Sequence, residues 1–213
     1  MERLLHPPTG HGPGLLLIHS WWGLSKGITA LGQDLAKAGF VVRMADLHDG
    51  QIAATQNEAE ALRRRKRKQP MYRDLYDDLA VLRREGGVGA NPVGVIGLSM
   101  GGHWAIWLAQ RAELNIAACV CYYACRGGDF SVSKADYLLH YAEVDAFIKP
   151  AAKRNMAAAI TCAGRPLESH DYQGTRHWFA ESDRPEFAPS AALEALNRSK
   201  GFLHQRLTAT ASS

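Results

Sequence analysis

The segment "VGVIGLSMGGHWAIWLA", residues 93–109, carries the strongest structural signal in this chain of 213 residues. An apolar, β-branched run leads into a turn rich in glycine, and a stretch with helical spacing follows, which predicts the order strand, sharp turn, helix. Gly97 and Gly101 lie two residues before and two residues after Ser99, so strand and helix can approach closely in a strained turn. Such a turn holds a serine hydroxyl out above the edge of a sheet. The alternative is a glycine-rich connection with a purely structural role.

The rest of the chain alternates between strand-like and helix-like patterns. Apolar runs predict strands at residues 14–19, 40–47, 116–123, 136–143 and 166–174. Helical spacing predicts helices near 28–38, 58–68, 72–84, 150–160 and 190–207, the last with Leu193, Leu196, Leu203 and Leu207 on its inner side. This alternation is typical of βαβ units. The sequence therefore predicts one α/β domain over residues 1–213, with a mostly parallel central sheet and helices on both faces.

Composition indicates a folded globular chain and argues against several classes of protein. Hydrophobic residues make up 46% and charged residues 22% of the sequence, with a formal charge of +4. Part of this charge lies in one basic run, residues 63–68. The run continues a predicted helix without interleaved aromatic residues, so we interpret it as a solvated helix face and expect no nucleic-acid partner. No segment resembles a secretory leader or a membrane span, so a cytoplasmic location and no membrane partner are expected.

Three of the four cysteines lie close together in "ACVCYYAC", residues 118–125. Cys119 and Cys121 fall on one face of a predicted strand. A zinc site would need a second pair of Cys or His residues at matching spacing, which the sequence lacks. We therefore interpret these cysteines as buried free thiols and predict no metal site.

Candidate partners for Ser99 follow two later strands. Asp145 comes just after the strand at 136–143, and His177 follows the strand at 166–174. Ligands of open α/β sheets bind beyond the carboxyl ends of the strands, and the chain order serine, acid, histidine fits a hydrolase of this architecture. An alcohol is a weak nucleophile at neutral pH, so an imidazole must take its proton and a carboxylate must orient that imidazole. Glu143 is the alternative acid, but it lies nearer the strand end.

The loop "HSWWGL" after the first strand supplies further parts of such a site. The backbone amides of Trp21 and Met100 are predicted to bind the oxyanion of a tetrahedral intermediate. Trp21 and Trp22 are expected to line a pocket, since they would otherwise be exposed indoles. Tyr123 and Trp178 would complete an apolar, aromatic pocket.

Taken together, these motifs resemble the dienelactone hydrolase family of the α/β-hydrolase superfamily. The resemblance rests on "LLLIHSWWGLSKGITALGQDLAKAGFVVRMADLHDG", "VGVIGLSMGG", "YAEVDAF" and "YQGTRHWFAESDRPEF", in this order, and spans residues 15–207. Its most selective parts are Tyr-x-Gly-Thr-x-His-x-Phe and the Trp-Trp-Gly-Leu after the first strand. The resemblance implies an α/β-hydrolase fold without an inserted cap domain, an esterase or lactonase reaction, and no metal or organic cofactor.

Three positions depart from the dienelactone hydrolases proper. Those proteins have a cysteine where this chain has Ser99, and a glutamate that interacts with the thiol where this chain has Ser20. The two changes agree with each other, because a carboxylate that controls the ionisation of a thiol is less needed beside an alcohol, whose proton the histidine takes. They also hold a substrate carboxylate with an arginine four residues after the histidine, where this chain has Glu181. A dienelactone substrate is therefore not favoured, although Arg126 could meet an anion at the rim.

The sequence thus predicts a serine hydrolase that cleaves small carboxylic esters or lactones through an acyl-enzyme, with a small molecule as its partner. Two alternatives stay open: an acyl thioesterase with the same three residues, and a hydrolase fold retained for binding without catalysis. Residues 47–91 could carry the surface that selects the substrate. The residues expected around the substrate are Ser20, Trp22, Tyr123, Arg126 and Trp178.

Overall fold

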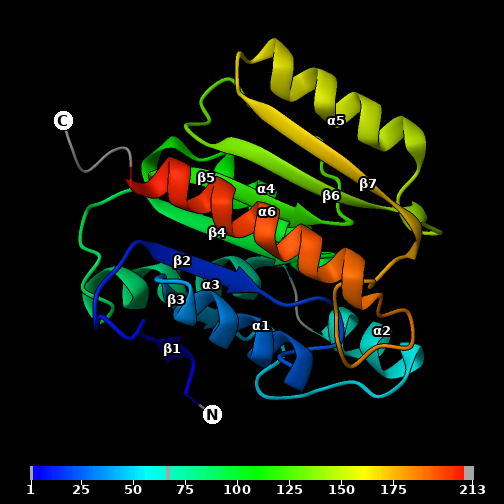
Figure 1. Ribbon diagram of the computed structural model, residues 1–213, viewed down its shortest axis with the longest axis horizontal. Coiled ribbons are helices and arrows are strands. Elements are labelled where there is room, and N and C mark those ends of the chain that lie inside the picture. Colours follow the sequence, from blue (N-terminus) through cyan, green and yellow to red (C-terminus); the bar gives the residue numbers. More distant parts are fainter. Residues whose placement is uncertain (1, 66–67, 209–213) are drawn as a thin grey trace.

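A sheet with the strand order β1-β3-β2-β4-β5-β6-β7 organises the fold (Figure 1). The computed structural model describes residues 2–65 and 68–208. Strand β1 is antiparallel to β3, and the remaining pairs are parallel. In chain order the elements are β1 (Leu4–Leu5), β2 (Gly14–Ile18), α1 (Lys26–Lys37), β3 (Val41–Ala45), α2 (Gln56–Arg65), α3 (Lys68–Arg84), β4 (Val93–Leu98), α4 (Met100–Ala109), the 3-10 turn η1 (Ala112–Leu114), β5 (Ile116–Tyr122), β6 (Asp136–Val144), α5 (Pro150–Cys162), β7 (Leu167–Arg176) and α6 (Pro189–Thr208).

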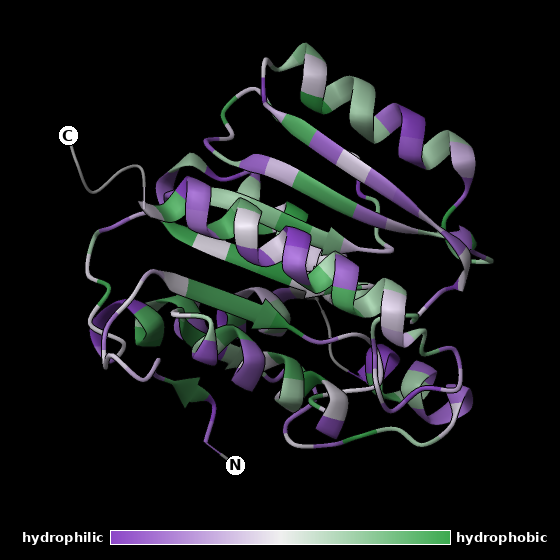
Figure 2. Ribbon diagram, viewed as in Figure 1, coloured by the Kyte–Doolittle hydropathy of each residue, from purple (hydrophilic) through white to green (hydrophobic). Residues whose placement is uncertain are grey.

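Helices cover both faces of the sheet and enclose two apolar cores. One core packs α3, α4 and α5 against the strands through residues such as Leu75, Ile106 and Ile160. The other packs α1 and α6 through Ile28 and Phe202. Strands β2 and β4 are buried along their whole lengths. Figure 2 shows them as mainly hydrophobic, whereas hydrophobic and hydrophilic residues are mixed along the edge strand β7. The predicted α/β fold class is confirmed.

The turn between β4 and α4 is tight because two of its residues have no side chain. A Cβ atom on Gly97 would lie 2.2 Å from the carbonyl oxygen of Gly101, and one on Gly101 would lie 2.2 Å from the carbonyl oxygen of Ile18. Backbone oxygens cannot yield to such contacts, so glycine is required at both positions. The predicted order of strand, sharp turn and helix is confirmed.

Two details of the secondary-structure prediction differ. The two-residue strand β1 was not predicted, because so short a pairing leaves no periodic pattern. Leu193 was expected on the inner side of α6, but 59% of its surface is exposed. Ala195 and Phe202 are buried instead. Each helical residue turns by about 100°, so Leu193 lies on the side of the helix opposite Ala195.

The basic run and the cysteines only partly occupy the places that the sequence suggested. Arg63, Arg64 and Arg65 are exposed at the end of α2, and residues 66 and 67 lie outside the described part of the chain. Cys119 and Cys121 are buried free thiols as predicted, whereas Cys125, which was expected to be buried with them, is only half-buried because it lies beyond the end of β5 and borders a cavity. Within residues 2–65 and 68–208, no group of His, Cys, Asp or Glu side chains is arranged to hold a metal ion, and no helix has the length and apolar character needed to cross a membrane.

Candidate active site

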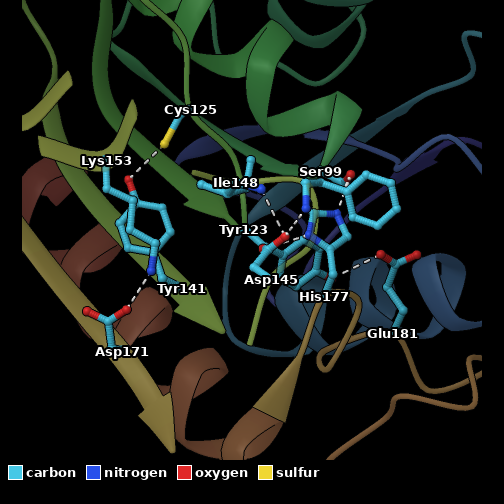
Figure 3. Close-up of polar contacts among 11 residues, drawn as sticks. Ser99, Tyr123, Cys125, Tyr141, Asp145, Ile148, Lys153, Asp171, His177 and Glu181 are labelled. Atoms are coloured by element: carbon cyan, nitrogen blue, oxygen red, sulfur yellow. Dashed lines mark hydrogen bonds and ion pairs between the residues drawn. The ribbon is translucent and has the colours of Figure 1, made fainter. Parts of the chain in front are cut away.

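Three side chains from the carboxyl ends of β4, β6 and β7 form a chain of hydrogen bonds (Figure 3). Nδ1 of His177 donates to Oδ2 of Asp145 over 2.7 Å. With its proton on Nδ1, the imidazole presents an unprotonated Nε2 to the Ser99 hydroxyl, which lies 2.8 Å away. The residues predicted from chain order therefore meet at one place.

Asp145 is held in place by its backbone surroundings. Its Oδ1 atom accepts hydrogen bonds from the amides of Phe147 at 2.8 Å and Ile148 at 3.0 Å. Burial by itself raises the pKa of Asp145, but the hydrogen bond and charge of His177, together with the two amides, outweigh it and hold the pKa below its usual range. Asp145 is therefore ionised at neutral pH and faces the imidazole.

Glu143, the alternative acid, has a different partner. Its Oε2 atom accepts a hydrogen bond from the backbone amide of Gly174 in β7 at 2.7 Å, and its side chain is exposed. Among the described residues the carboxylate bonded to His177 is that of Asp145. The geometry thus agrees with the preference for Asp145.

Three residues of the site have backbone conformations that L-amino acids rarely adopt. The φ angle is +53° at Ser99, +39° at Tyr123 and +72° at Trp178. The neighbouring strands enforce two of them: the amide of Ser99 donates to the carbonyl oxygen of Tyr122 at 2.9 Å, and that of Tyr123 to the carbonyl oxygen of His140 at 2.6 Å. Such strain costs about 1–3 kcal/mol per residue and clusters at functional sites.

A cavity of about 940 Å³ borders Ser99 and His177, within the range typical of small-molecule sites. Part of its wall is aromatic. The rings of Trp21 and Trp178 stack with centroids 5.8 Å apart, and the ring of Phe147 lies 4.7 Å from that of His177. The expected pocket residues that border the cavity are Trp21, Tyr123, Arg126 and Trp178.

Ser20 and Trp22 do not border this cavity, so their assignment to the pocket is wrong. Ser20 is fully buried, and its hydroxyl finds a partner there by donating to Oε2 of Glu181 at 2.7 Å. Trp22 is 5% exposed. Its ring packs 5.2 Å from that of Trp178, and the guanidinium carbon of Arg184 lies 4.5 Å from its centroid on another side. Both side chains therefore lie behind the cavity wall, where Ser20 bonds Glu181 and Trp22 packs against the lining residue Trp178.

Helices α2, α3 and α4 contribute residues to the cavity wall that were not predicted from the sequence. Arg63 and Arg64 border the cavity although they are exposed, so the basic run is more than a solvated face. Glu60 lies on the same side of α2 and pairs with Arg64 at 2.7 Å. The spacing of these three residues, i, i+3 and i+4, is the signal that would have placed them together. Within residues 47–91, the cavity is bordered by Glu60, Arg63, Arg64, Met71 and Tyr72. That this segment selects the substrate stays a prediction.

Glu181 is a second buried acid at the site. Its side chain accepts hydrogen bonds from the hydroxyls of Ser20 at 2.7 Å and Tyr123 at 3.0 Å. Burial raises the pKa of Glu181 to about 7, and the two hydroxyl hydrogen bonds only partly oppose that rise. No sequence pattern links these three residues, so the contact could not be predicted.

The sheet order, the helices on both faces and the arrangement at Ser99 define an α/β hydrolase. A family model described as "Dienelactone hydrolase family" matches residues 1–207. The chain therefore belongs to the dienelactone hydrolase family and is a hydrolase of carboxylic esters. Over 213 residues it is 24% identical to a Bradyrhizobium sp. protein named "Probable 2-oxo-3-(5-oxofuran-2-ylidene)propanoate lactonase", with 93% of this chain and 86% of that protein covered.

Solved structures show the same fold. A dienelactone hydrolase-like promiscuous phosphotriesterase from metagenomic libraries superposes with a TM-score of 0.80 at 16% identity, covering 92% of this chain and 87% of that one. A thermophilic esterase from Thermogutta terrifontis superposes with a TM-score of 0.69, also at 16% identity, covering 95% and 88% respectively. The predicted family resemblance is confirmed.

The buried carboxyl of Glu181 predicts a pH dependence of stability. The folded state holds the proton up to about pH 7, whereas the unfolded state releases it near pH 4.5. The free energy of unfolding should therefore fall as pH rises between these values, and a pKa difference of this size corresponds to about 3 kcal/mol. Glu181→Gln cannot ionise. Measured by urea unfolding, its free energy of unfolding relative to that of the wild type should therefore be higher at pH 8.5 than at pH 5, by an amount on the order of these 3 kcal/mol. An unfolding difference that stays the same at both pH values would contradict the expectation.

Proposed function

We propose that the chain is a single-domain serine hydrolase that cleaves small carboxylic esters or lactones through an acyl-enzyme intermediate. The observation that carries the proposal is the continuous hydrogen-bond chain from Asp145 through His177 to Ser99 beside the cavity. A buried carboxylate, an oriented imidazole and a serine on a strained turn are the parts that nucleophilic acyl transfer requires. In this proposal the three residues form a catalytic triad.

The reaction would proceed in two halves. Oγ of Ser99 attacks the carbonyl carbon while Nε2 of His177 takes the hydroxyl proton, and Asp145 stabilises the imidazolium. His177 then gives that proton to the leaving oxygen, which departs with the alcohol of an ester or stays attached to the acyl group of a lactone. In the second half His177 takes a proton from water, the resulting hydroxide attacks the acyl-enzyme, and the acid leaves as Ser99 recovers its proton.

The backbone amides of Trp21 and Met100 would bind the oxyanion. Met100 is the first residue of α4, and the first amides of a helix have no acceptor within it and carry partial positive charge. Nε2 of His48 donates to the carbonyl oxygen of Trp21 at 3.1 Å, which steadies the loop that would present the Trp21 amide. Losing one such donor typically costs about 2.7–4 kcal/mol in the transition state.

The aromatic wall favours acyl or aryl groups without charge, as the sequence suggested. Trp21, Phe147 and Trp178 offer flat apolar surface next to Ser99. A lactone substrate is proposed because the Bradyrhizobium relative is named as a lactonase. The cytoplasmic location and the absence of nucleic-acid and membrane partners stay predictions from the sequence.

Hydrolysis of a panel of p-nitrophenyl esters, small lactones including a dienelactone, and acyl thioesters tests the proposal. Ser99→Ala should lower turnover of esters and lactones by about 10⁴-fold or more, because the nucleophile is lost. Thioesters that react faster than every ester would favour the thioesterase alternative. Equal turnover by Ser99→Ala would contradict the serine mechanism, and no turnover by either protein would favour a binding role.

The assignment of the acid has a matched pair of variants. Asp145→Asn keeps the size of the side chain but removes the charge, and should lower kcat by about 10³–10⁴-fold because the imidazole loses its correct tautomer and its counter-charge. Glu143→Gln removes the same charge two residues away and should leave kcat within about twofold, since exposed charges contribute little. Steady-state kinetics at pH 7.5 compares them. A larger loss in Glu143→Gln than in Asp145→Asn would reverse the assignment.

A further inference from the structure

The carboxyl group of Glu181 joins two loops of the site that are distant in sequence. Its Oε2 atom accepts from the hydroxyl of Ser20, which follows β2. Its Oε1 atom accepts from the hydroxyl of Tyr123, which follows β5, and Figure 3 shows Glu181 and Tyr123. Glu181 itself lies four residues after His177 and is 1% exposed. Three strand-end loops of the site therefore meet at one carboxyl group.

The contact with Ser20 acts on the proposed oxyanion loop. Ser20 precedes Trp21, so a displacement of Ser20 would also move the Trp21 amide. The backbone carbonyl of Ser20 accepts from the amide of Gly23 at 3.3 Å, within the same loop. Glu181 adds a contact to the buried side chain of Ser20, beside those that the His19 and His48 imidazoles make with the carbonyl oxygens of Ser20 and Trp21.

The contact with Tyr123 acts on the imidazole. The ring centroid of Tyr123 lies 4.8 Å from that of His177, and the ring of Phe147 packs against the same imidazole at 4.7 Å. Tyr123 holds its strained φ of +39° at this place. A strained residue stays in position only where its surroundings determine it, and the hydrogen bond to Glu181 is one of those constraints.

We propose that Glu181 is a positioning residue of the hydrolase, which sets the place of the oxyanion loop relative to His177 without touching the substrate. This role rests on the serine hydrolase function proposed above. Two carboxyl oxygens can accept from two hydroxyls at once, so one side chain ties both loops. An apolar side chain of similar size would leave both buried hydroxyls without that acceptor.

The burial of Glu181 makes the contact sensitive to pH, because it raises the pKa of this carboxyl group. The groups that face it are Ser20 and Tyr123 from the two loops, and Asp183 and Arg184 from its own segment. Asp183 accepts from the amide of Gly27 at the start of α1 at 3.2 Å. Because burial raises the pKa of Glu181 to about 7, its hydrogen bonds become charge-assisted and stronger as pH rises through neutrality.

Five single variants test the role, each checked for folding by circular dichroism and thermal unfolding. Glu181→Leu removes both contacts. Glu181→Gln keeps them, because its amide can accept from one hydroxyl and donate to the oxygen of the other, but it cannot ionise. Ser20→Ala and Tyr123→Phe remove one contact each. Glu168→Gln, on the exposed side of β7, is the charge-matched control.

A positioning role should lower kcat and leave KM nearly unchanged. Glu181→Leu should lower kcat about 10- to 100-fold with KM within about twofold, because misplaced groups slow the chemical step. Glu181→Gln should stay within about fivefold of the wild-type kcat at pH 6. In the wild type, kcat should rise further as Glu181 ionises near pH 7 and its hydrogen bonds strengthen, and Glu181→Gln should lack this rise. Adding Ser20→Ala or Tyr123→Phe to Glu181→Leu should cost less than about twofold more, since the contact is already gone. Glu168→Gln should match the wild type.

Several outcomes would overturn the positioning role. They are a wild-type kcat in Glu181→Leu, a loss confined to KM, full additivity with Ser20→Ala and Tyr123→Phe, or a Glu181→Gln pH profile that superposes on that of the wild type. If Glu181→Leu did not fold, the double variant Ser20→Ala, Tyr123→Phe, which removes both contacts and leaves Glu181 in place, should show the same loss of kcat with KM within about twofold, and a wild-type kcat in it would overturn the role. Turnover that survives Ser99→Ala in the same assay would instead overturn the proposed function.

Discussion

The close contact between β4 and α4 at Ser99 determines where the residues of the site come together. Gly97 and Gly101 bring the helix backbone against the ends of β4 and β2, where any side chain would collide with a carbonyl oxygen. The helix therefore starts at the edge of the sheet where β6 and β7 also end, and this edge receives Asp145 and His177. Parallel strands bring residues 78 positions apart into a hydrogen bond because their carboxyl ends coincide.

Most strands and helices, and the order of the three site residues, could be predicted because local patterns encode them. The β-branched run and paired glycines mark the turn at Ser99, and residues after strand ends mark the acid and the histidine. The inner side of α6 could not be predicted from leucines alone, because packing on the sheet sets the rotation of the helix and leaves Leu193 outside. The side chain of Ser20 points to Glu181 rather than into the cavity, and because the two residues lie 161 positions apart, no local pattern links them.

Two of the departures from the dienelactone hydrolases proper are direct partners in the structure. Ser20 stands where those proteins have a glutamate, and Glu181 stands where they have an arginine, yet the two side chains share a hydrogen bond of 2.7 Å. A carboxyl group therefore still lies at this contact but belongs to the loop after β7. Burial keeps this carboxyl group neutral below about pH 7, so in that range it offers Ser20 and Tyr123 an uncharged acceptor.

Covalent labelling shows whether Ser99 is an activated nucleophile. The protein is incubated with a fluorophosphonate, digested, and mapped by mass spectrometry, alongside His177→Ala as the variant that lacks the base. The serine mechanism predicts an adduct on Ser99 in the wild type that forms far more slowly in the variant, because only a serine paired with a general base reacts readily. No adduct, or an adduct on another residue, would contradict it.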